Sequence, residues 1–236
     1  MFSLETFHGI DIFFCYDRVG GIIMDILHGT EDYFQFVKPY QEAMDFLMVQ
    51  INILNDDYRG KYRDYPIHNI QTRIKTKESI LGKLEKKELK KDFETAKNHL
   101  TDIAGIRIIC YFESDVYHVA EQLKKYTDLI CMRESDYIAK PKPNGYKSYH
   151  IILGVPVYHT DSKEYYPVEV QIRTLTMDLW ASMEHRIIYK SSNVNMKKSR
   201  KVFLEFAEEL RDCEKQLFEL EEENNKKDMW IDGPTF

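Results

Sequence analysis

Two stretches of the chain carry apolar residues at alternating steps of three and four. The first contains Tyr33, Val37, Tyr40, Met44, Leu47, Ile51, Leu54 and Tyr58. The second contains Phe203, Phe206, Leu210, Cys213, Leu217 and Leu220. Such spacing places side chains on one face of a helix, so both stretches predict long amphipathic helices. The second is short for a free coiled coil, and we expect it to pack on the first helix of the same or another subunit.

Shorter elements are predicted between these two helices. Strands are expected over 106–112, 129–134, 149–158 and 166–174, and helices over 69–86, 92–100, 116–125 and 175–190. The polar turn 159–164 joins the last two strands into a hairpin. The order of elements predicts one domain that contains both helices and strands.

The strand over 166–174 alternates apolar with polar side chains. The apolar residues are Val168, Val170 and Ile172, and the polar residues are Glu169, Gln171 and Arg173. Because successive strand residues point to opposite faces, the first three can face a core while a carboxylate, an amide and a guanidinium share the other face. On this strand alone, a solvated sheet face is the simpler interpretation.

Composition limits the class of protein. The chain has 236 residues, 43% of them hydrophobic, and a net charge of −6. A sizeable hydrophobic core is therefore expected. Because the net charge is negative, any surface that binds phosphates must be local. RNA is a possible partner, but the overall charge does not indicate it. The four cysteines lack metal-binding spacing and the apolar start is interrupted by charges, which predicts reduced thiols, a cytoplasmic protein and no membrane span.

The chain divides into three expected regions. Residues 1–30 contain several glycines and no sustained period, so we interpret them as an irregular N-terminal extension that can include a short amphipathic helix, and the sequence does not reveal its role. Residues 31–192 form the central domain with its leading amphipathic helix. Residues 196–226 form a C-terminal helix for packing or oligomerisation.

Cationic side chains gather before the first predicted strand. Lys75, Ser79 and Lys83 are spaced i, i+4 and i+8, so they would stack along one face of the predicted helix, with Arg73 just before them. Glutamates intersperse the segment, and a solvated helix with salt bridges is the alternative. Arg107 lies instead inside an apolar run, where a buried charge needs an anionic partner.

The loop over 137–150 combines lysines with aromatic rings. Two prolines and Asn144-Gly145 predict a turn-rich loop, and lysines at positions 140, 142 and 147 surround Tyr146 and Tyr149. A nucleobase could stack on such a ring beside lysines that meet phosphates. Mixtures of lysine and aromatic residues are also ordinary protein surface.

Asp102 and Glu169 are two separated carboxylates among these cations. Paired carboxylates near many cations describe a site where Mg²⁺ and a polyphosphate meet. The sequence has no Gly-x-x-x-x-Gly-Lys-Ser/Thr motif, so side chains would have to position the phosphates. Asp102 also has a simpler interpretation, as a cap or turn residue.

Four segments, in this order, carry a family resemblance: RIKTKESILGK (73–83), DIAGIR (102–107), NGYKSYH (144–150) and VEVQIRT (168–174). Together they resemble the synthetase domain of RelA/SpoT-type proteins, and the chain looks most like the stand-alone small alarmone synthetases. The resemblance implies a nucleotidyltransferase-like α+β fold, a mixed β-sheet flanked by helices, with long terminal helices. It implies a transferase of the stringent response, a GTP diphosphokinase that moves the β,γ-diphosphate of ATP to the 3′-hydroxyl of GDP or GTP, giving ppGpp or pppGpp and AMP.

The resemblance also implies a role for each matching residue. Asp102 and Glu169 would be catalytic and hold Mg²⁺, and Glu169 would take the proton of the 3′-hydroxyl. The ATP-binding residues would be Arg73, Lys75, Ser79, Lys83 and Arg107, with the two arginines around the adenine. The residues around GDP or GTP would be Lys142, Asn144, Tyr146, His150, Gln171 and Arg173, with Tyr146 stacked on the guanine. A homotetramer is implied as well.

A second hypothesis is a catalytically silent regulatory oligomer that binds guanine nucleotides or RNA, because a basic helix and a Lys-Tyr loop would also serve that function. The two carboxylates favour the enzyme, since they repel phosphate unless a metal ion intervenes.

Overall fold

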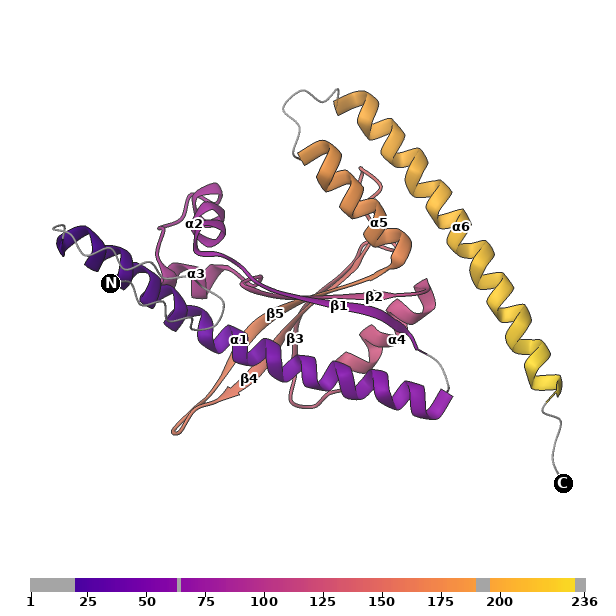
Figure 1. Ribbon diagram of the computed structural model, residues 1–236, viewed down its shortest axis with the longest axis horizontal. Helices are drawn as coiled ribbons and strands as arrows, with labels where there is room; N and C mark the ends of the chain where they lie inside the picture. The colour runs from indigo at the N-terminus through magenta and orange to yellow at the C-terminus, as the bar shows by residue number, and fades with distance from the viewer. Residues whose placement is uncertain (1–19, 63–64, 190–195, 232–236) are drawn as a thin grey trace, which may run out of the picture.

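The computed structural model describes residues 20–62, 65–189 and 196–231, and the side chains of residues 31–59, 65–188 and 198–224. A five-stranded sheet carries helices on both faces, and the two longest helices lie on opposite sides of it (Figure 1). In chain order the elements are α1 (Gly20–Tyr62), β1 (Ile67–Ile74), α2 (Lys77–Lys86), α3 (Phe93–His99), β2 (Ala104–Cys110), α4 (Glu113–Lys124), β3 (Ile130–Asp136), β4 (Tyr149–Tyr158), β5 (Lys163–Thr174), α5 (Leu175–Glu184), the π-helix η1 (His185–Tyr189) and α6 (Met196–Ile231).

The sheet is mixed, with strand order β1-β2-β5-β4-β3. Strands β2 and β5 pair in parallel, and the other neighbours are antiparallel. A parallel pair needs a long crossover connection. Here α4, β3 and β4 lie between the two strands in the chain. The predicted mixed α+β sheet flanked by helices is confirmed.

One face of the sheet is covered by α1 and α4, which contact β2, β4 and β5 (Figure 1). The predicted stripe of α1 lies on this face, and Leu47 and Ile51 are fully buried. Val168, Val170 and Ile172 of β5 are also fully buried, as the alternation of that strand predicted. The opposite face of β5 therefore remains for polar side chains, with α2 and α5 standing on either side of it (Figure 1).

The predicted helix over 69–86 is wrong in its first half, where Ile67–Ile74 forms the edge strand β1. Ile67, Ile70 and Ile74 are spaced by three and four residues, which imitates a helical stripe. The segment instead pairs antiparallel with β2 along its length. The hydrogen bonds and side-chain packing of the sheet outweigh such a weak local pattern.

The long terminal helices differ from their predictions in two respects. Helix α1 begins at Gly20, so residues 20–30 belong to this long helix rather than to an irregular extension or a separate short helix, while residues 1–19 lie outside the described part of the chain. Helix α6 packs against α5, and Figure 1 shows α1 on the other side of the sheet. Packing of α6 on α1 of the same chain is therefore wrong, and packing on another subunit remains a prediction.

Over the described residues, no helix combines the length and the apolar character that a membrane span requires.

Candidate active site

A cleft of about 480 Å³ lies over the polar face of β1, β2 and β5. The parallel register of β2 and β5 places Gly105 beside Glu169 and Arg107 beside Gln171, so polar groups of both strands meet there. The cleft is lined by Gln71, Thr72, Arg73, Gly105, Ile106, Arg107, Glu169, Gln171 and Arg173. It unites residues assigned to ATP with residues assigned to the acceptor nucleotide.

Asp102, just before β2, binds two lysines. Lys75 Nζ and Lys83 Nζ each donate a hydrogen bond of 2.5 Å to Asp102 Oδ2. Burial raises the pKa of the Asp102 carboxyl, but the two lysines outweigh this effect and leave the pKa below its usual value. Asp102 Oδ1 is buried and has no hydrogen-bond partner among the residues that the structure describes. One carboxylate oxygen therefore remains available for another ligand.

The start of α2 explains this arrangement. Thr76 caps the helix by accepting a hydrogen bond from the backbone N–H of Ser79. Lys75 therefore precedes the helix, and the prediction that it lies on the same helix face as Ser79 and Lys83 is wrong. The backbone N–H of Lys75 is bonded to the carbonyl of Ile103, 2.8 Å away, which brings its side chain beside Asp102. Lys83, two turns into the helix, reaches the same carboxylate. Ser79 is exposed and contacts Thr76, and neither Ser79 nor Asp102 with its two lysines is among the residues that line the cleft.

Glu169 is the second carboxylate, and its neighbours keep it ionised. Gln171 Nε2 donates a hydrogen bond of 3.0 Å to Glu169 Oε2, and His150 Nδ1 lies 3.7 Å from Glu169 Oε1. Burial raises the pKa of Glu169, but His150 and Gln171 outweigh it and the pKa falls below its usual value. Glu169 is therefore available as a proton acceptor at neutral pH, and its position rather than a raised basicity must make it effective.

Two arginines of the cleft share one carboxylate. Asp178 Oδ1, on α5, lies 3.4 Å from Arg107 Nη1 and 3.1 Å from Arg173 Nη1. Arg107 Nη1 also donates a hydrogen bond of 3.2 Å to Gln71 Oε1. The prediction that Arg107 has an anionic partner is confirmed, and the partner comes from outside the four sequence motifs.

Tyr146 joins the loop before β4 to the cleft. Arg173 Nη2 donates hydrogen bonds to the Tyr146 hydroxyl at 2.7 Å and to Gln171 Oε1 at 3.0 Å. The Tyr146 hydroxyl lies 2.9 Å from His150 Nε2. Four of the residues predicted for the acceptor nucleotide therefore form one hydrogen-bonded group.

The two other predicted acceptor residues lie on the outer part of the loop. Lys142 Nζ lies between two rings, 4.6 Å from the centroid of Tyr137 and 4.7 Å from that of Tyr146. Asn144 Nδ2 donates a hydrogen bond of 3.4 Å to Glu184 Oε1. Lys142 and Asn144 line a neighbouring cavity of about 630 Å³ rather than the cleft itself.

Sequence reasoning missed Asp178, Tyr137 and Ser148. Asp178 lies in the first turn of α5, where an acidic residue is ordinary because of the helix dipole, so its sequence position gave no specific signal. Tyr137 belongs to the predicted loop, but the sequence gave no reason to assign it a function. Ser148 is fully buried and accepts a hydrogen bond of 3.4 Å from Arg173 Nε.

The carboxylates Asp102 and Glu169 fit part of the coordination that a Mg²⁺ ion needs. Among the described residues, no group of three or more His, Cys, Asp or Glu side chains could hold a metal. Mg²⁺ commonly uses only one or two carboxylates and completes its coordination with substrate phosphates and water. The unpartnered Oδ1 of Asp102 fits such a site, and Glu169 lies beside Gly105, three residues after Asp102 in the chain.

Comparison with known proteins gives the same family by sequence. The family model described as "Region found in RelA / SpoT proteins" matches residues 72–194. The chain is 42% identical over 169 residues to the GTP pyrophosphokinase YwaC of Bacillus subtilis, a match that covers 72% of this chain and 80% of that protein. It is 35% identical over 176 residues to the GTP pyrophosphokinase YjbM of the same organism, over 74% of this chain and 81% of that protein.

Solved structures show the same similarity. Small alarmone synthetase 2 of Bacillus subtilis matches with a TM-score of 0.72 and 39% identity, over 81% of this chain and 99% of that one. Small alarmone synthetase 1 of the same organism, bound to its product pppGpp, matches with a TM-score of 0.73 and 31% identity, over 81% of this chain and 97% of that one.

Proposed function

The chain belongs to the RelA/SpoT family, among the small alarmone synthetases, and we propose that it transfers the β,γ-diphosphate of ATP to the 3′-hydroxyl of GDP or GTP. The products are ppGpp or pppGpp and AMP. The protein is thus an enzyme, a GTP pyrophosphokinase that makes alarmones.

One observation carries the proposal: Glu169 and three arginines line a single cleft, and Asp102 with its two lysines lies near enough for its charge to act on Glu169. The register of β2 with β5 pairs Gly105 with Glu169, and Asp102 comes three residues before Gly105. Lys75 and Lys83 converge on Asp102, while Arg107 and Arg173 converge on Asp178. The diphosphate group carries several negative charges while it is transferred. Cationic side chains that are already in place stabilise these charges without having to move.

Each substrate has its own set of residues in this proposal. Arg73 and Arg107 hold the adenine, and Lys75 and Lys83 contact the ATP phosphates. Ser79, although exposed and outside the cleft wall, stays in the ATP set because it lies within the first turn of α2. Lys142, Asn144, Tyr146, His150, Gln171 and Arg173 surround the acceptor, with Tyr146 stacked on the guanine.

The chemical step moves one proton and one diphosphate. The oxygen of the acceptor 3′-hydroxyl attacks the β-phosphorus of ATP, its bond to phosphorus forms, and the bond from the β-phosphorus to the oxygen that bridges to the α-phosphate breaks. The bridging oxygen leaves with AMP, and Glu169 accepts the proton of the hydroxyl. Gln171 and His150 orient Glu169 for this role, since both contact its carboxylate.

Asp102 and Glu169 would hold Mg²⁺, which the unpartnered Oδ1 of Asp102 supports. When bound, the ion would neutralise part of the charge on the transferred diphosphate.

We further propose a homotetramer that acts in the cytoplasm. Leu217 and Leu220 of α6 are each 54% exposed, although they continue the apolar stripe that packs Phe203 against α5. A second subunit would cover these side chains.

A direct assay tests the function. Purified protein is incubated with ATP, Mg²⁺ and either GDP or GTP, and the nucleotides are separated by anion exchange, with a chelator in the control reaction. The proposal predicts equal amounts of AMP and of a more highly charged guanine nucleotide. Binding of both nucleotides without either product would contradict it and favour the silent guanine-nucleotide or RNA-binding oligomer.

A further inference from the structure

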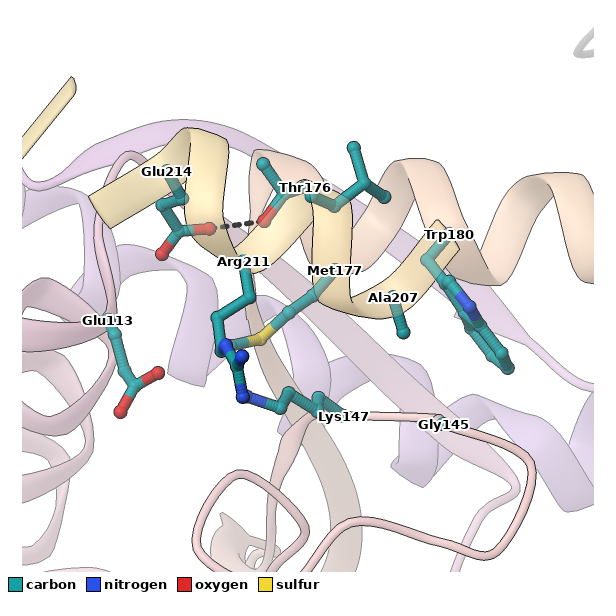
Figure 2. Close-up of a pocket in the computed structure, with 10 residues that line it drawn as sticks. Glu113, Gly145, Lys147, Thr176, Met177, Trp180, Ala207, Arg211 and Glu214 are labelled. Atoms are coloured by element: carbon teal, nitrogen blue, oxygen red, sulfur yellow. Dashed lines mark hydrogen bonds between the residues drawn. The ribbon is translucent and has the colours of Figure 1, made fainter. Parts of the chain in front are cut away.

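Helix α6 carries a buried carboxylate that the reaction does not use. Glu214 is only 9% exposed, although most acidic side chains of this helix face solvent. Its Oε2 accepts a hydrogen bond of 2.6 Å from the hydroxyl of Thr174 and another from the hydroxyl of Thr176. Figure 2 shows the Glu214 carboxylate directed at Thr176 across the junction of α6 with α5. Such a buried group is costly unless these contacts are made.

The two threonines lie where the acceptor side of the cleft is built. Thr174 is the last residue of β5 and the N-cap of α5, and it is fully buried. Arg173 precedes it and donates to Tyr146, while Asp178, in the first turn of the capped helix, binds Arg173. Glu214 therefore fixes the joint between the strand and the helix that supply this pair.

The same helix also supports the acceptor loop. Gly145 has a φ of 93°, and a Cβ at this position would lie 3.2 Å from Ala207 Cβ and 3.5 Å from Leu204 Cδ2. The loop backbone thus rests directly on α6, between the predicted acceptor residues Asn144 and Tyr146. In Figure 2 Gly145 and Lys147 of the loop face Ala207 and Arg211 of α6 across a small cavity.

From these two contacts we propose that Glu214 is a positioning residue for the acceptor nucleotide and that α6 is part of the acceptor site of its own chain. Glu214 holds the β5–α5 joint and Ala207 holds the loop, so Arg173 and Tyr146 keep their relative positions. Among the described residues α6 packs mainly against α5, and β1, α2 and β2 of the ATP side are not among the elements with which it packs extensively. This inference rests on the proposed function, because it concerns one of the two substrates of that reaction.

The test compares the apparent KM values of the two substrates. For Glu214→Ala we expect the KM for GDP to rise about tenfold, because the lost hydrogen bonds act on GDP only indirectly through the β5–α5 joint, and the KM for ATP to change by less than about twofold. Glu214→Gln keeps an oxygen that can accept from both threonines, so it should stay within about threefold of the wild type for GDP. Glu208→Ala removes an exposed carboxylate of the same helix and is the matched control.

A second variant tests the inference without changing Glu214, in case Glu214→Ala does not fold. Ala207→Leu adds bulk against the loop without touching Glu214, and the same selective rise in the KM for GDP is expected. Calorimetric titration with GDP alone should show the same loss of affinity, and thermal unfolding shows whether each variant is folded.

The outcomes separate this inference from the proposed function. A wild-type protein that forms no product contradicts the proposed function. An active wild type whose Glu214→Ala and Ala207→Leu variants lose affinity for ATP as much as for GDP, or for neither, overturns the positioning role. An equal effect of Glu214→Ala and Glu214→Gln would also overturn it, because the hydrogen-bond acceptor would then be irrelevant.

Discussion

Lys75 Nζ lies 2.5 Å from Asp102 Oδ2, with both side chains largely buried although 27 positions separate them in the chain. The contact places a cation proposed for the ATP phosphates directly on a carboxylate proposed for the metal ion. Lys83 reaches the same oxygen but is 38% exposed. Phosphates bound beside the cleft would compete with Asp102 for both ammonium groups, so Asp102 holds these groups at the proposed phosphate site.

Replacement of Lys75 should weaken ATP binding and destabilise the fold. We expect Lys75→Met to raise the KM for ATP about tenfold and to lower the free energy of unfolding by about 1–3 kcal/mol, since Asp102 loses one of its two buried partners. Lys83→Met should affect ATP similarly but stability less, because solvent screens its exposed ammonium. Steady-state kinetics and urea unfolding measure both effects. Lys86→Met on the same helix is the control, and an equal loss there would refute the assignment.

Glu169→Gln should abolish turnover while nucleotides still bind. The amide keeps the shape of the side chain and cannot accept the proton of the 3′-hydroxyl, so we expect kcat to fall about 100- to 10,000-fold. Calorimetric titration should show GDP affinity close to that of the wild type. Glu164→Gln, at the exposed start of the same strand, should keep its activity. Full activity of Glu169→Gln would exclude Glu169 as the base.

Asp178→Asn should impair both substrates together. Asp178 binds Arg107 of the ATP set and Arg173 of the acceptor set, and loss of its charge leaves two neighbouring guanidinium groups to repel each other. We expect the KM for ATP and the KM for GDP each to rise about fivefold. This result differs from the selective effect expected for Glu214→Ala. A change in only one of the two KM values would show that Asp178 does not connect the sites.

The stability of the protein should depend on the ionisation of Glu214. Burial raises the pKa of Glu214, Glu113 of α4 raises it further, Thr174 and Thr176 lower it, and Lys147 of the loop lowers it, while Arg211 lines the same cavity. A raised folded-state pKa gives a stabilising contribution that is complete below the unfolded value near 4.5 and is lost as the pH rises through the folded value.

The difference in Tm between the wild type and Glu214→Gln should therefore fall as the pH rises above about 4.5 and then become constant. Differential scanning calorimetry at several pH values measures this difference in Tm. The subtraction cancels the effects of the titratable groups that both proteins share. A difference that grows with pH over this window would show that the threonines outweigh burial.

The sequence by itself determined most of the framework. Period-two alternation over 166–174 was enough to assign Glu169, Gln171 and Arg173 to one face, because neighbouring side chains of a strand must point apart. The stripe from Tyr33 to Tyr58 likewise fixed the buried face of α1, since helical geometry is local. The four ordered motifs then identified the family and predicted the residues of each substrate set.

Only the tertiary structure decided which residues meet. Ile67–Ile74 carries a helical spacing and became a strand because β2 offered it a partner, which the local pattern does not record. Asp178 and Glu214 looked like ordinary helix acids, and their partners Arg107 and Thr174 lie 71 and 40 positions away in the chain. Contacts between distant segments depend on how the whole chain packs, whereas the periodicity of a sequence reports only on neighbouring residues. For this reason the contacts of Asp178 and Glu214 could not be predicted from the sequence.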